Sequence, residues 1–259
     1  MMIGCIVQAR MGSSRLPGKV MKKIDADCLL DYVIKQLQSS KKIQKTIVAT
    51  TNLVEDDVIC AHLKSQNIDF FRGSSEDVLD RYYQCAKQYQ IDIIVRITSD
   101  NPLIDPSIVD FIIDKYENQK CDLATNTITR TFPYGTEVEV FSFGSLKKAW
   151  EQAKMPSDRE HVTPFIRDPQ NRFVLSNIEY ADGNLSHIRY TVDRVEDLNL
   201  VKEIVQNISA RPILLHDIIN LYKTKPMIFQ INKDVKHDGY ASSLKKDEEY
   251  LKSQKNGKI

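Results

Sequence analysis

The chain has 259 residues, 42% of them hydrophobic and 27% charged, which is typical of a globular protein and excludes a disordered or collagen-like chain. Its 36 Lys and Arg residues nearly balance 35 Asp and Glu residues, leaving a net charge of +1. We therefore expect no nucleic acid and no membrane among its partners. No apolar run reaches the roughly 18 residues of a membrane span, and Met1–Val7 is too short for a secretory signal. These features predict a cytoplasmic protein.

The cysteines and histidines give no local metal-binding or disulfide pattern. The five cysteines are far apart and never form a Cys-x-x-Cys motif: Cys5, Cys28, Cys60, Cys85 and Cys121. We interpret them as buried or incidental thiols of a reducing compartment, not as zinc ligands or disulfides. Four histidines also lack ligand-like spacing and are interpreted as surface or packing residues: His62, His187, His216 and His237.

Short β-branched runs alternate with longer amphipathic stretches through the first 125 residues. The predicted strands are Ile3–Gln8, Thr46–Thr51, Asp69–Phe71 and Ile93–Thr98. The predicted helices lie near Leu29–Ser40, Glu55–Gln66, Ser75–Tyr89 and Pro106–Asn118. Asp105 caps the last of these helices, ahead of proline at the first helical position. Such alternation of strand and helix predicts a parallel, doubly wound α/β sheet.

The second half of the chain is more mixed. It predicts strands at Glu137–Phe141, Arg172–Ser176 and His187–Val192. It predicts helices at Ser142–Lys154, Asp158–Asp168 and Glu196–Ile208. Ser157 and Glu160 have the spacing of a capping box. Because no linker interrupts the chain, we expect one domain over residues 1–241, followed by a charged tail over residues 242–259.

The loop after the first strand carries the strongest functional signal. Gly12 and Gly18 allow the backbone to turn and to approach a ligand closely. Arg10, Arg15 and Lys19 add positive charge to a turn whose amides form an anion-binding concavity. A polyphosphate is the natural ligand, and the alternative is an ordinary polar surface loop. The spacing matches neither a dinucleotide-binding fingerprint nor a Walker-type loop.

The residues of this loop also resemble a known family. Val7–Lys19, with the sequence VQARMGSSRLPGK, is similar to the nucleotide-binding signature of cytidylyltransferases that activate acidic sugars, the CMP-Kdo and CMP-sialic acid synthetases. It most resembles their spore-coat polysaccharide, SpsF-like, branch. Further similar segments are Thr98–Asp105, Arg159–Pro164, Tyr190–Asp193 with Glu196–Leu198, and Gly239–Ala241.

The resemblance implies a fold, an assembly and an activity. The fold is the Rossmann-like, three-layer α/β/α nucleotide-diphospho-sugar transferase fold with a mostly parallel sheet. The family commonly forms a homodimer through residues 130–165. The implied reaction transfers CMP from CTP to an acidic sugar, sialic acid-like or Kdo-like, with release of pyrophosphate, for surface polysaccharide or glycoconjugate synthesis. The alternatives are another nucleotide, a phosphate or phosphonate acceptor, or a non-catalytic nucleotide-binding protein.

The resemblance also assigns roles in the nucleotide site. Arg10, Arg15 and Lys19 would hold the phosphates, and Gln8, Ala9 and Ser13 would approach the nucleotide. Arg15, Lys19 and Asp100 would be the catalytic residues.

Two aspartates are the candidates for a metal site. Asp100 and Asp193 each follow a predicted strand, so we expect both at the sheet edge that carries the Arg10–Lys19 loop. Through the resemblance, both are expected to hold Mg²⁺, which neutralises a triphosphate with carboxylate help. The structural alternatives are an Asx turn at Asp100 and a helix N-cap at Asp193.

The candidates for contact with the acceptor are weaker. They are Tyr134, Glu137, Glu139, Arg159 and His161. Glu137 and Glu139 would share one face of a strand and meet sugar hydroxyls, with a solvated strand face as the alternative. Arg159 and His161 would contact either the sugar acid or a second subunit.

Overall fold

A computed structural model describes residues 1–235 and 239–256 of the chain, so His237 lies outside the described residues. Its centre is a seven-stranded sheet with the order β3-β2-β1-β4-β6-β5-β7. The strands are β1 (Ile3–Gln8), β2 (Lys45–Thr51), β3 (Phe70–Gly73), β4 (Ile93–Thr98), β5 (Leu123–Thr125), β6 (Glu139–Ser142) and β7 (Leu175–Asn177). The four strands predicted in the first half are therefore confirmed, with small shifts at their ends.

The pairing of the strands sets the edge at which a ligand can bind. The pairs β1–β2, β1–β4, β2–β3 and β5–β7 are parallel. Strand β6 runs antiparallel between β4 and β5. In this register Arg96 pairs with Glu139, so the amino end of β6 lies at the same edge as the carboxyl ends of β1 and β4. The sheet is mostly parallel, as predicted.

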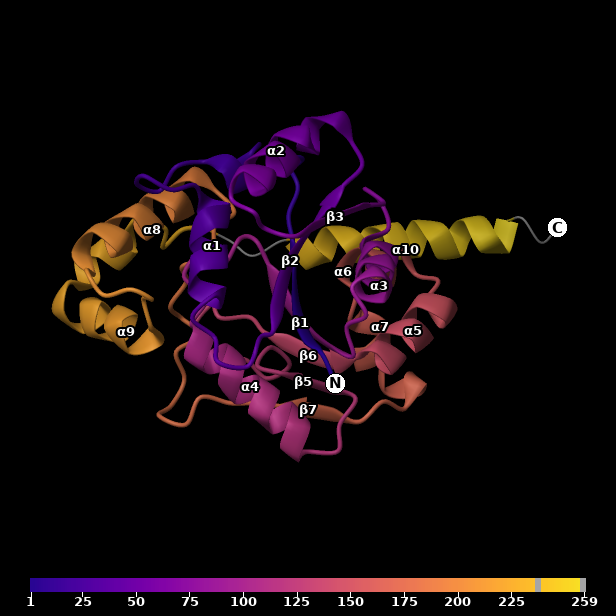
Figure 1. The fold of residues 1–259 in the computed structure, drawn as a ribbon. Coiled ribbons are helices and arrows are strands. Elements are labelled where there is room, and N and C mark those ends of the chain that lie inside the picture. Colours follow the sequence, from indigo (N-terminus) through magenta and orange to yellow (C-terminus); the bar gives the residue numbers. More distant parts are fainter. Residues whose placement is uncertain (236–238, 257–259) are drawn as a thin grey trace.

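Helices cover both faces of the sheet, which gives three layers (Figure 1). The helices are α1 (Leu29–Leu37), α2 (Asp57–Ser65), α3 (Val78–Gln88), α4 (Pro106–Asn118), α5 (Phe143–Gln152), α6 (Pro156–His161), α7 (Pro164–Arg167), α8 (Val195–Asn207), α9 (Leu215–Thr224) and α10 (Gly239–Asn256). Short 3-10 turns are η1 (Lys19–Met21), η2 (Val54–Asp56), η3 (Pro169–Asn171) and η4 (Pro226–Gln230). No helix in the described part of the chain has the length and apolar character needed to cross a membrane.

The two faces of the sheet pack into two apolar clusters. One joins the sheet to helices α1, α2, α4, α8 and α9, and the other joins it to α3, α5 and α7. Helix α1 shows how the sequence directs this packing, because its apolar stripe of Leu29, Leu30, Val33, Ile34 and Leu37 is at most 2% exposed. Each such side chain contributes about 1.5–3 kcal/mol by leaving water. The α/β fold predicted from periodicity is confirmed.

The strand predicted at His187–Val192 is wrong. This segment forms only an isolated bridge, between Arg189 and Tyr134. Its backbone instead bonds to loops, because the Tyr190 amide donates to the Tyr134 carbonyl and the Val192 amide donates to the Asp100 carbonyl at 2.8 Å. The alternating apolar pattern arises because the segment is buried against loops, not because it pairs with a strand.

The predicted helix Asp158–Asp168 is divided into α6 and α7. Val162 between them has a φ of 72°, and Pro164 begins the second helix. Proline lacks the amide that a continuous helix needs and disfavours helical backbone in the residue before it. The predicted strand at Glu137 likewise begins later, at Glu139.

The capping box predicted at Ser157 is also wrong. Met155 is the N-cap of α6, with no side-chain cap. The Ser157 amide and hydroxyl instead donate to Asp247 on α10, at 2.8 and 2.5 Å, and Glu160 accepts from Lys246. Helix α10 therefore packs on α6, and the domain boundary expected at residue 242 falls inside this helix. Strand β5 and helix α9 were not predicted.

Candidate active site

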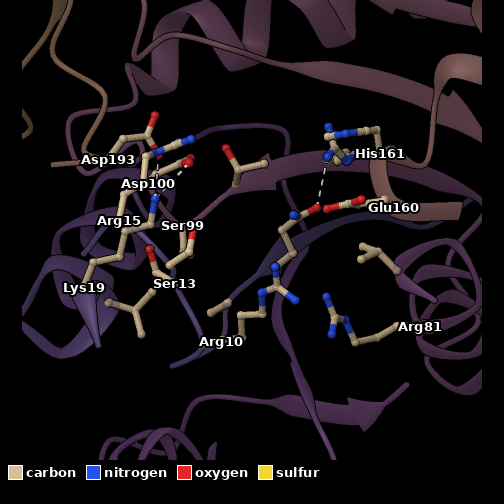
Figure 2. A pocket seen from close by; sticks show the side chains of 18 residues that line it. Arg10, Ser13, Arg15, Lys19, Arg81, Ser99, Asp100, Glu160, His161 and Asp193 are labelled. Carbon is tan, nitrogen blue, oxygen red and sulfur yellow. Dashed lines mark hydrogen bonds and ion pairs between the residues drawn. The ribbon is translucent and has the colours of Figure 1, made fainter. Parts of the chain in front are cut away.

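A pocket of about 380 Å³ opens where β1 and β4 end. The loop after β1, the first turn of α3 and the segment before α8 form its walls. Figure 2 shows the side chains that line it. All eight residues predicted to hold nucleotide or metal are among them: Gln8, Ala9, Arg10, Ser13, Arg15, Lys19, Asp100 and Asp193. The fold thus brings together residues that lie up to 185 positions apart in the sequence.

The loop after β1 is held in place by a buried carboxylate that the sequence did not indicate. Asp56, fully buried in η2, accepts from the Met11 amide at 2.7 Å and from the Thr51 amide at 3.1 Å. The loop closes when the Gly18 amide donates to the Met11 carbonyl at 3.0 Å. Gly18 has a φ of 66°, in the left-handed region that favours glycine. These contacts fix the loop that presents Arg15 and η1.

Lys19 joins the two predicted metal-binding aspartates. Its Nζ atom lies 3.2 Å from Asp100 Oδ2 and 3.1 Å from Asp193 Oδ1, and it also donates to the Val192 carbonyl at 2.7 Å. Burial lowers the pKa of Lys19, but the charges of Asp100 and Asp193 outweigh burial and raise it. Lys19 is therefore a fixed ammonium ion at this end of the pocket.

Asp193 is held by cations on several sides. Its Oδ1 lies 2.8 Å from the Arg15 guanidinium and its Oδ2 lies 3.1 Å from Arg189. Burial raises the pKa of Asp193, but Lys19 and Arg15 outweigh it and hold the pKa well below its usual range. The carboxylate thus stays ionised and directed into the pocket (Figure 2).

The structural alternatives for these residues were a helix N-cap at Asp193 and an Asx turn at Asp100, and neither accounts for their contacts. The N-cap residue of α8 is Arg194, and Asp197, not Asp193, accepts from its amide at 3.0 Å. Asp197 also accepts from Arg189 at 3.1 Å, which positions the arginine beside Asp193. The side chain of Asp100 faces Lys19.

The donor set at Asp100 and Asp193 fits a magnesium ion. Two carboxylates at the mouth of a cation-rich loop supply the oxygen ligands that Mg²⁺ takes when phosphates complete its shell. Both carboxylates remain partly accessible, at 27% and 22% exposed. Lys19 now bridges them, at the position where a dication bound to both would compete with it.

A second pocket of about 660 Å³ adjoins the first. The two share Arg96, Thr98 and His161. Burial raises the pKa of Glu139, but Arg167 and Arg96, both ion-paired to it, lower the pKa to about 2. Glu139 is thus an ionised, buried carboxylate that holds two guanidinium groups at the pocket wall.

The remaining predicted acceptor residues have different surroundings. Glu137 lines the second pocket and pairs with Arg130 at 2.6 Å. Tyr134 lines a third cavity, and the Arg130 guanidinium lies 3.9 Å from its ring centroid. Arg159 lines neither of the two adjoining pockets, because it donates to Asp77 at 2.9 Å and ties α6 to α3. His161 lies where the pockets meet, and burial, followed by Arg96, lowers its pKa, which favours neutral imidazole.

Comparison with known proteins decides the family. The cytidylyltransferase family model matches residues 4–235. The chain belongs to this family. The chain is similar to the spore coat polysaccharide biosynthesis protein SpsF of Bacillus subtilis (strain 168). The two are 32% identical over 228 residues, which cover 85% of this chain and 94% of SpsF. A cytidylyltransferase structure from Leptospira borgpetersenii is 34% identical, with a TM-score of 0.86, and covers 92% of this chain and 100% of that one.

The acidic-sugar branch of the family is also represented. The 3-deoxy-manno-octulosonate cytidylyltransferase of Trichlorobacter lovleyi is 31% identical over 116 residues, or 45% of each chain. The resemblance based on Val7–Lys19 is therefore confirmed, as is the fold that it implied.

Four arginines that line the pockets of this cytidylyltransferase were not predicted from the sequence. Arg81 lies in the first pocket, 2% exposed, and its Nε has no hydrogen-bond partner among the described residues. Arg96, Arg130 and Arg167 line the second pocket. Only Arg96 gave a usable signal, because a charged residue inside the apolar strand Ile93–Thr98 requires a buried partner. Arg81 and Arg167 lie in amphipathic stretches, where an arginine usually faces water.

Proposed function

We propose that this cytidylyltransferase transfers CMP from CTP to an acidic sugar and releases pyrophosphate, supplying an activated sugar for surface polysaccharide or glycoconjugate synthesis. The observation that carries the proposal is the junction of two pockets. One has Arg15 and Lys19 beside two carboxylates, and the other is lined by three arginines together with five acidic residues, two of which hold the arginines in place. A nucleotide and an anionic acceptor could thus meet at the residues that the pockets share.

The nucleotide would lie in the first pocket with its triphosphate toward Lys19 and Arg15. The Lys19 side chain is 12% exposed and the Arg15 side chain 32% exposed, so both could contact phosphate oxygens. The opposite side of the pocket, toward Arg10 and Arg81 in Figure 2, would hold the base and ribose. The family match supports cytosine as the base.

The acceptor would lie in the second pocket with its carboxylate toward the arginines. Arg130 and Arg167 line this pocket together with Arg96, and guanidinium forks match carboxylate geometry. Arg167 donates to Thr127 at 2.5 Å and pairs with Glu139, so its orientation is fixed before the acceptor binds. Preorganised charge of this kind costs little on binding.

The reaction requires an acceptor hydroxyl to attack the α-phosphorus of CTP. A new P–O bond forms, the bond to the bridging oxygen breaks, and pyrophosphate leaves with the electron pair. The hydroxyl proton must be removed, and neutral His161 at the junction would accept it. Lys19 and Arg15 would stabilise the charge that develops on the phosphates, so catalysis is mainly positioning and electrostatics.

We propose Asp100 and Asp193 as the ligands of Mg²⁺. When bound there, the ion would neutralise phosphate charge and orient the triphosphate. Asp193 would be held ready by Arg189, which pairs with it at 3.1 Å. Asp197 in turn keeps Arg189 in place.

A pyrophosphate-release screen tests the proposal. Purified protein with Mg²⁺ is offered each of CTP, UTP, ATP and GTP with a panel of Kdo-like and sialic acid-like sugars, sugar phosphates and phosphonates. We expect release only with CTP and an acidic sugar. Release with a phosphate or phosphonate acceptor, or with another nucleotide, would assign the alternative substrate. Nucleotide binding without release from any pair would indicate a non-catalytic binding protein.

A further inference from the structure

A cluster of metal-ligating side chains lies outside both pockets, where helix α1 begins beside α2 (Figure 1). Cys28 is the N-cap of α1, Asp31 lies in its first turn, and His62 comes from α2. One ligand atom from each of the three lies within 4.8 Å of the others. The sequence did not suggest this site, because 30 residues separate Asp31 from His62 and only helix packing joins them.

The hydrogen bonds of this cluster conflict with one another. His62 Nε2 lies 2.6 Å from Asp31 Oδ1 and 3.0 Å from Gln66 Nε2. A ring nitrogen either donates one proton or accepts one. If Nε2 carries a proton, it donates to Asp31, but its N–H then faces the N–H groups of the Gln66 amide. If Nε2 carries no proton, its lone pair faces the Asp31 carboxylate. Exchanging the oxygen and nitrogen of the Gln66 amide does not help. Gln66 Nε2 also donates to Asp31 Oδ1 at 2.9 Å, and an oxygen in its place would face the carboxylate.

A cation would remove this conflict. An unprotonated imidazole nitrogen, a carboxylate oxygen, a thiolate and an amide oxygen can all donate electron pairs to one metal ion. We propose that Cys28, Asp31 and His62 bind a zinc-like transition-metal ion, with Gln66 or water as a fourth ligand. This site is independent of the proposed reaction.

One of the observed separations matches the one that zinc requires, and a second needs a small shift. Zn–S and Zn–N bonds of about 2.3 and 2.05 Å at a tetrahedral angle place the two ligand atoms about 3.6 Å apart. Cys28 Sγ and His62 Nε2 are 3.6 Å apart. Asp31 Oδ1 is nearer to His62 than the roughly 3.4 Å expected for two ligands of one ion. His62, 22% exposed, can make the shift of about 1 Å, while Asp31 is 3% exposed and capped into α1.

The donors also select the type of metal. Thiolate and imidazole favour zinc-like ions, whereas magnesium prefers a site of oxygen ligands such as Asp100 and Asp193. A bound ion would link the start of α1 to α2, and α2 directly follows the turn whose Asp56 holds the loop at Met11. We therefore expect this metal to stabilise the fold without acting on the substrate.

Cobalt titration of the metal-free full-length protein tests the proposal, because Co²⁺ substitutes for zinc and absorbs strongly when a thiolate binds it. We expect one equivalent to give a thiolate-to-cobalt charge-transfer band that zinc abolishes. Cys28→Ser should remove the band, whereas Cys60→Ser and Cys121→Ser should retain it. Asp100→Asn should also retain it, which separates this site from the proposed magnesium site.

A second variant keeps the test decisive if Cys28→Ser fails to fold. His62→Asn changes a partly exposed residue, and it should lower cobalt affinity by on the order of 10-fold or more. Zinc should raise the melting temperature of the wild-type protein and not that of this variant. The absence of a charge-transfer band in the wild-type protein, or a band unchanged in both variants, would overturn the proposal and leave the proposed transferase activity unaffected.

Discussion

The Nζ atom of Lys19 lies 3.1 Å from Oδ1 of Asp193, although the two are 174 positions apart in the chain. Asp100, from a third segment, meets the same ammonium group at 3.2 Å. Lys19 follows β1, Asp100 follows β4, and Asp193 follows a buried segment outside the sheet, so the contact forms only when these separate parts of the domain have folded. An ammonium group that joins three segments in this way makes the first pocket and the fold interdependent.

Replacing Lys19 tests the phosphate-binding assignment. Lys19→Met removes one charge-assisted contact worth about 1.5–3 kcal/mol, so we expect the dissociation constant for CTP to rise by roughly 10–150-fold. The variant also leaves Asp100 and Asp193 without their shared cation, so some loss of thermal stability is expected. Isothermal titration calorimetry measures the first effect and calorimetric melting the second.

Lys23→Met is the matched control for this change. Lys23 is exposed, its ammonium group donates to the nearby Ala26 carbonyl, and it lines neither pocket, so its replacement should leave CTP affinity unaltered. Equal CTP affinity in Lys19→Met and the wild-type protein would show that the loop does not bind the phosphates.

Replacing either aspartate should reduce catalysis to a similar extent, but the two replacements should differ in their effect on the stability of the fold. We expect Asp100→Asn and Asp193→Asn each to abolish most turnover, because a neutral amide is a poor ligand for a dication that faces a polyanion. The double variant should be little worse than either single one. Only Asp193→Asn should lower the melting temperature clearly, since Asp193 contacts Arg15, Lys19 and Arg189. Near wild-type rates in both single variants would place the metal elsewhere.

The sequence predicted the lining of the first pocket better than that of the second, for a physical reason. Arg10, Arg15 and Lys19 lie within ten residues, so local spacing already groups them at one strand end. Asp193 lines the first pocket as expected, although the strand from which its position was inferred does not form. The segment before it still reaches this edge, because the Val192 amide donates to the Asp100 carbonyl.

The acceptor pocket depends on contacts that no local pattern records. Glu139 was expected to meet sugar hydroxyls, but tertiary packing buries it to 3% exposure between Arg96 and Arg167. The break at Val162 turns the chain between α6 and α7, which brings Arg167 to Glu139. A helix predicted to run unbroken from Asp158 to Asp168 gave no indication of this turn.

Asp158 should make stability depend on pH. Burial, followed by repulsion from Asp247 and Asp168, raises the pKa of Asp158 to about 6. The unfolded chain therefore ionises this group at lower pH than the folded one does, so stability is lost as the pH rises from about 4 to about 6. Asp158→Asn should then melt higher than the wild-type protein above pH 6, by on the order of 2–4 °C for each kcal/mol recovered.

Thermal melts at several pH values check this sign. The advantage of Asp158→Asn should shrink as the pH falls from 6 to 4, because the wild-type carboxyl becomes protonated in both states. Asp182→Asn, at an exposed loop position, is a suitable control. Equal melting temperatures of Asp158→Asn and the wild-type protein at pH 7.5 would contradict the expected repulsion.

Arg167 provides the sharpest test of the acceptor pocket, because it lines the second pocket and not the first. Arg167→Ala removes one guanidinium while Arg96 remains paired with Glu139, so the carboxylate at the pocket wall keeps a partner. We expect the KM for an acidic-sugar acceptor to rise by roughly 10–150-fold and the KM for CTP to change little. The bonds to Thr127 and Glu139 both come from one nitrogen, Nη2, so a lysine could keep them. Arg167→Lys should still restore only part of the loss, because an ammonium group cannot offer an acceptor carboxylate a two-nitrogen fork. Arg172→Ala, an exposed arginine five residues along the chain, should leave both constants unchanged. If Arg167→Ala instead raised the KM for CTP alone, the two pockets would have to exchange their proposed ligands.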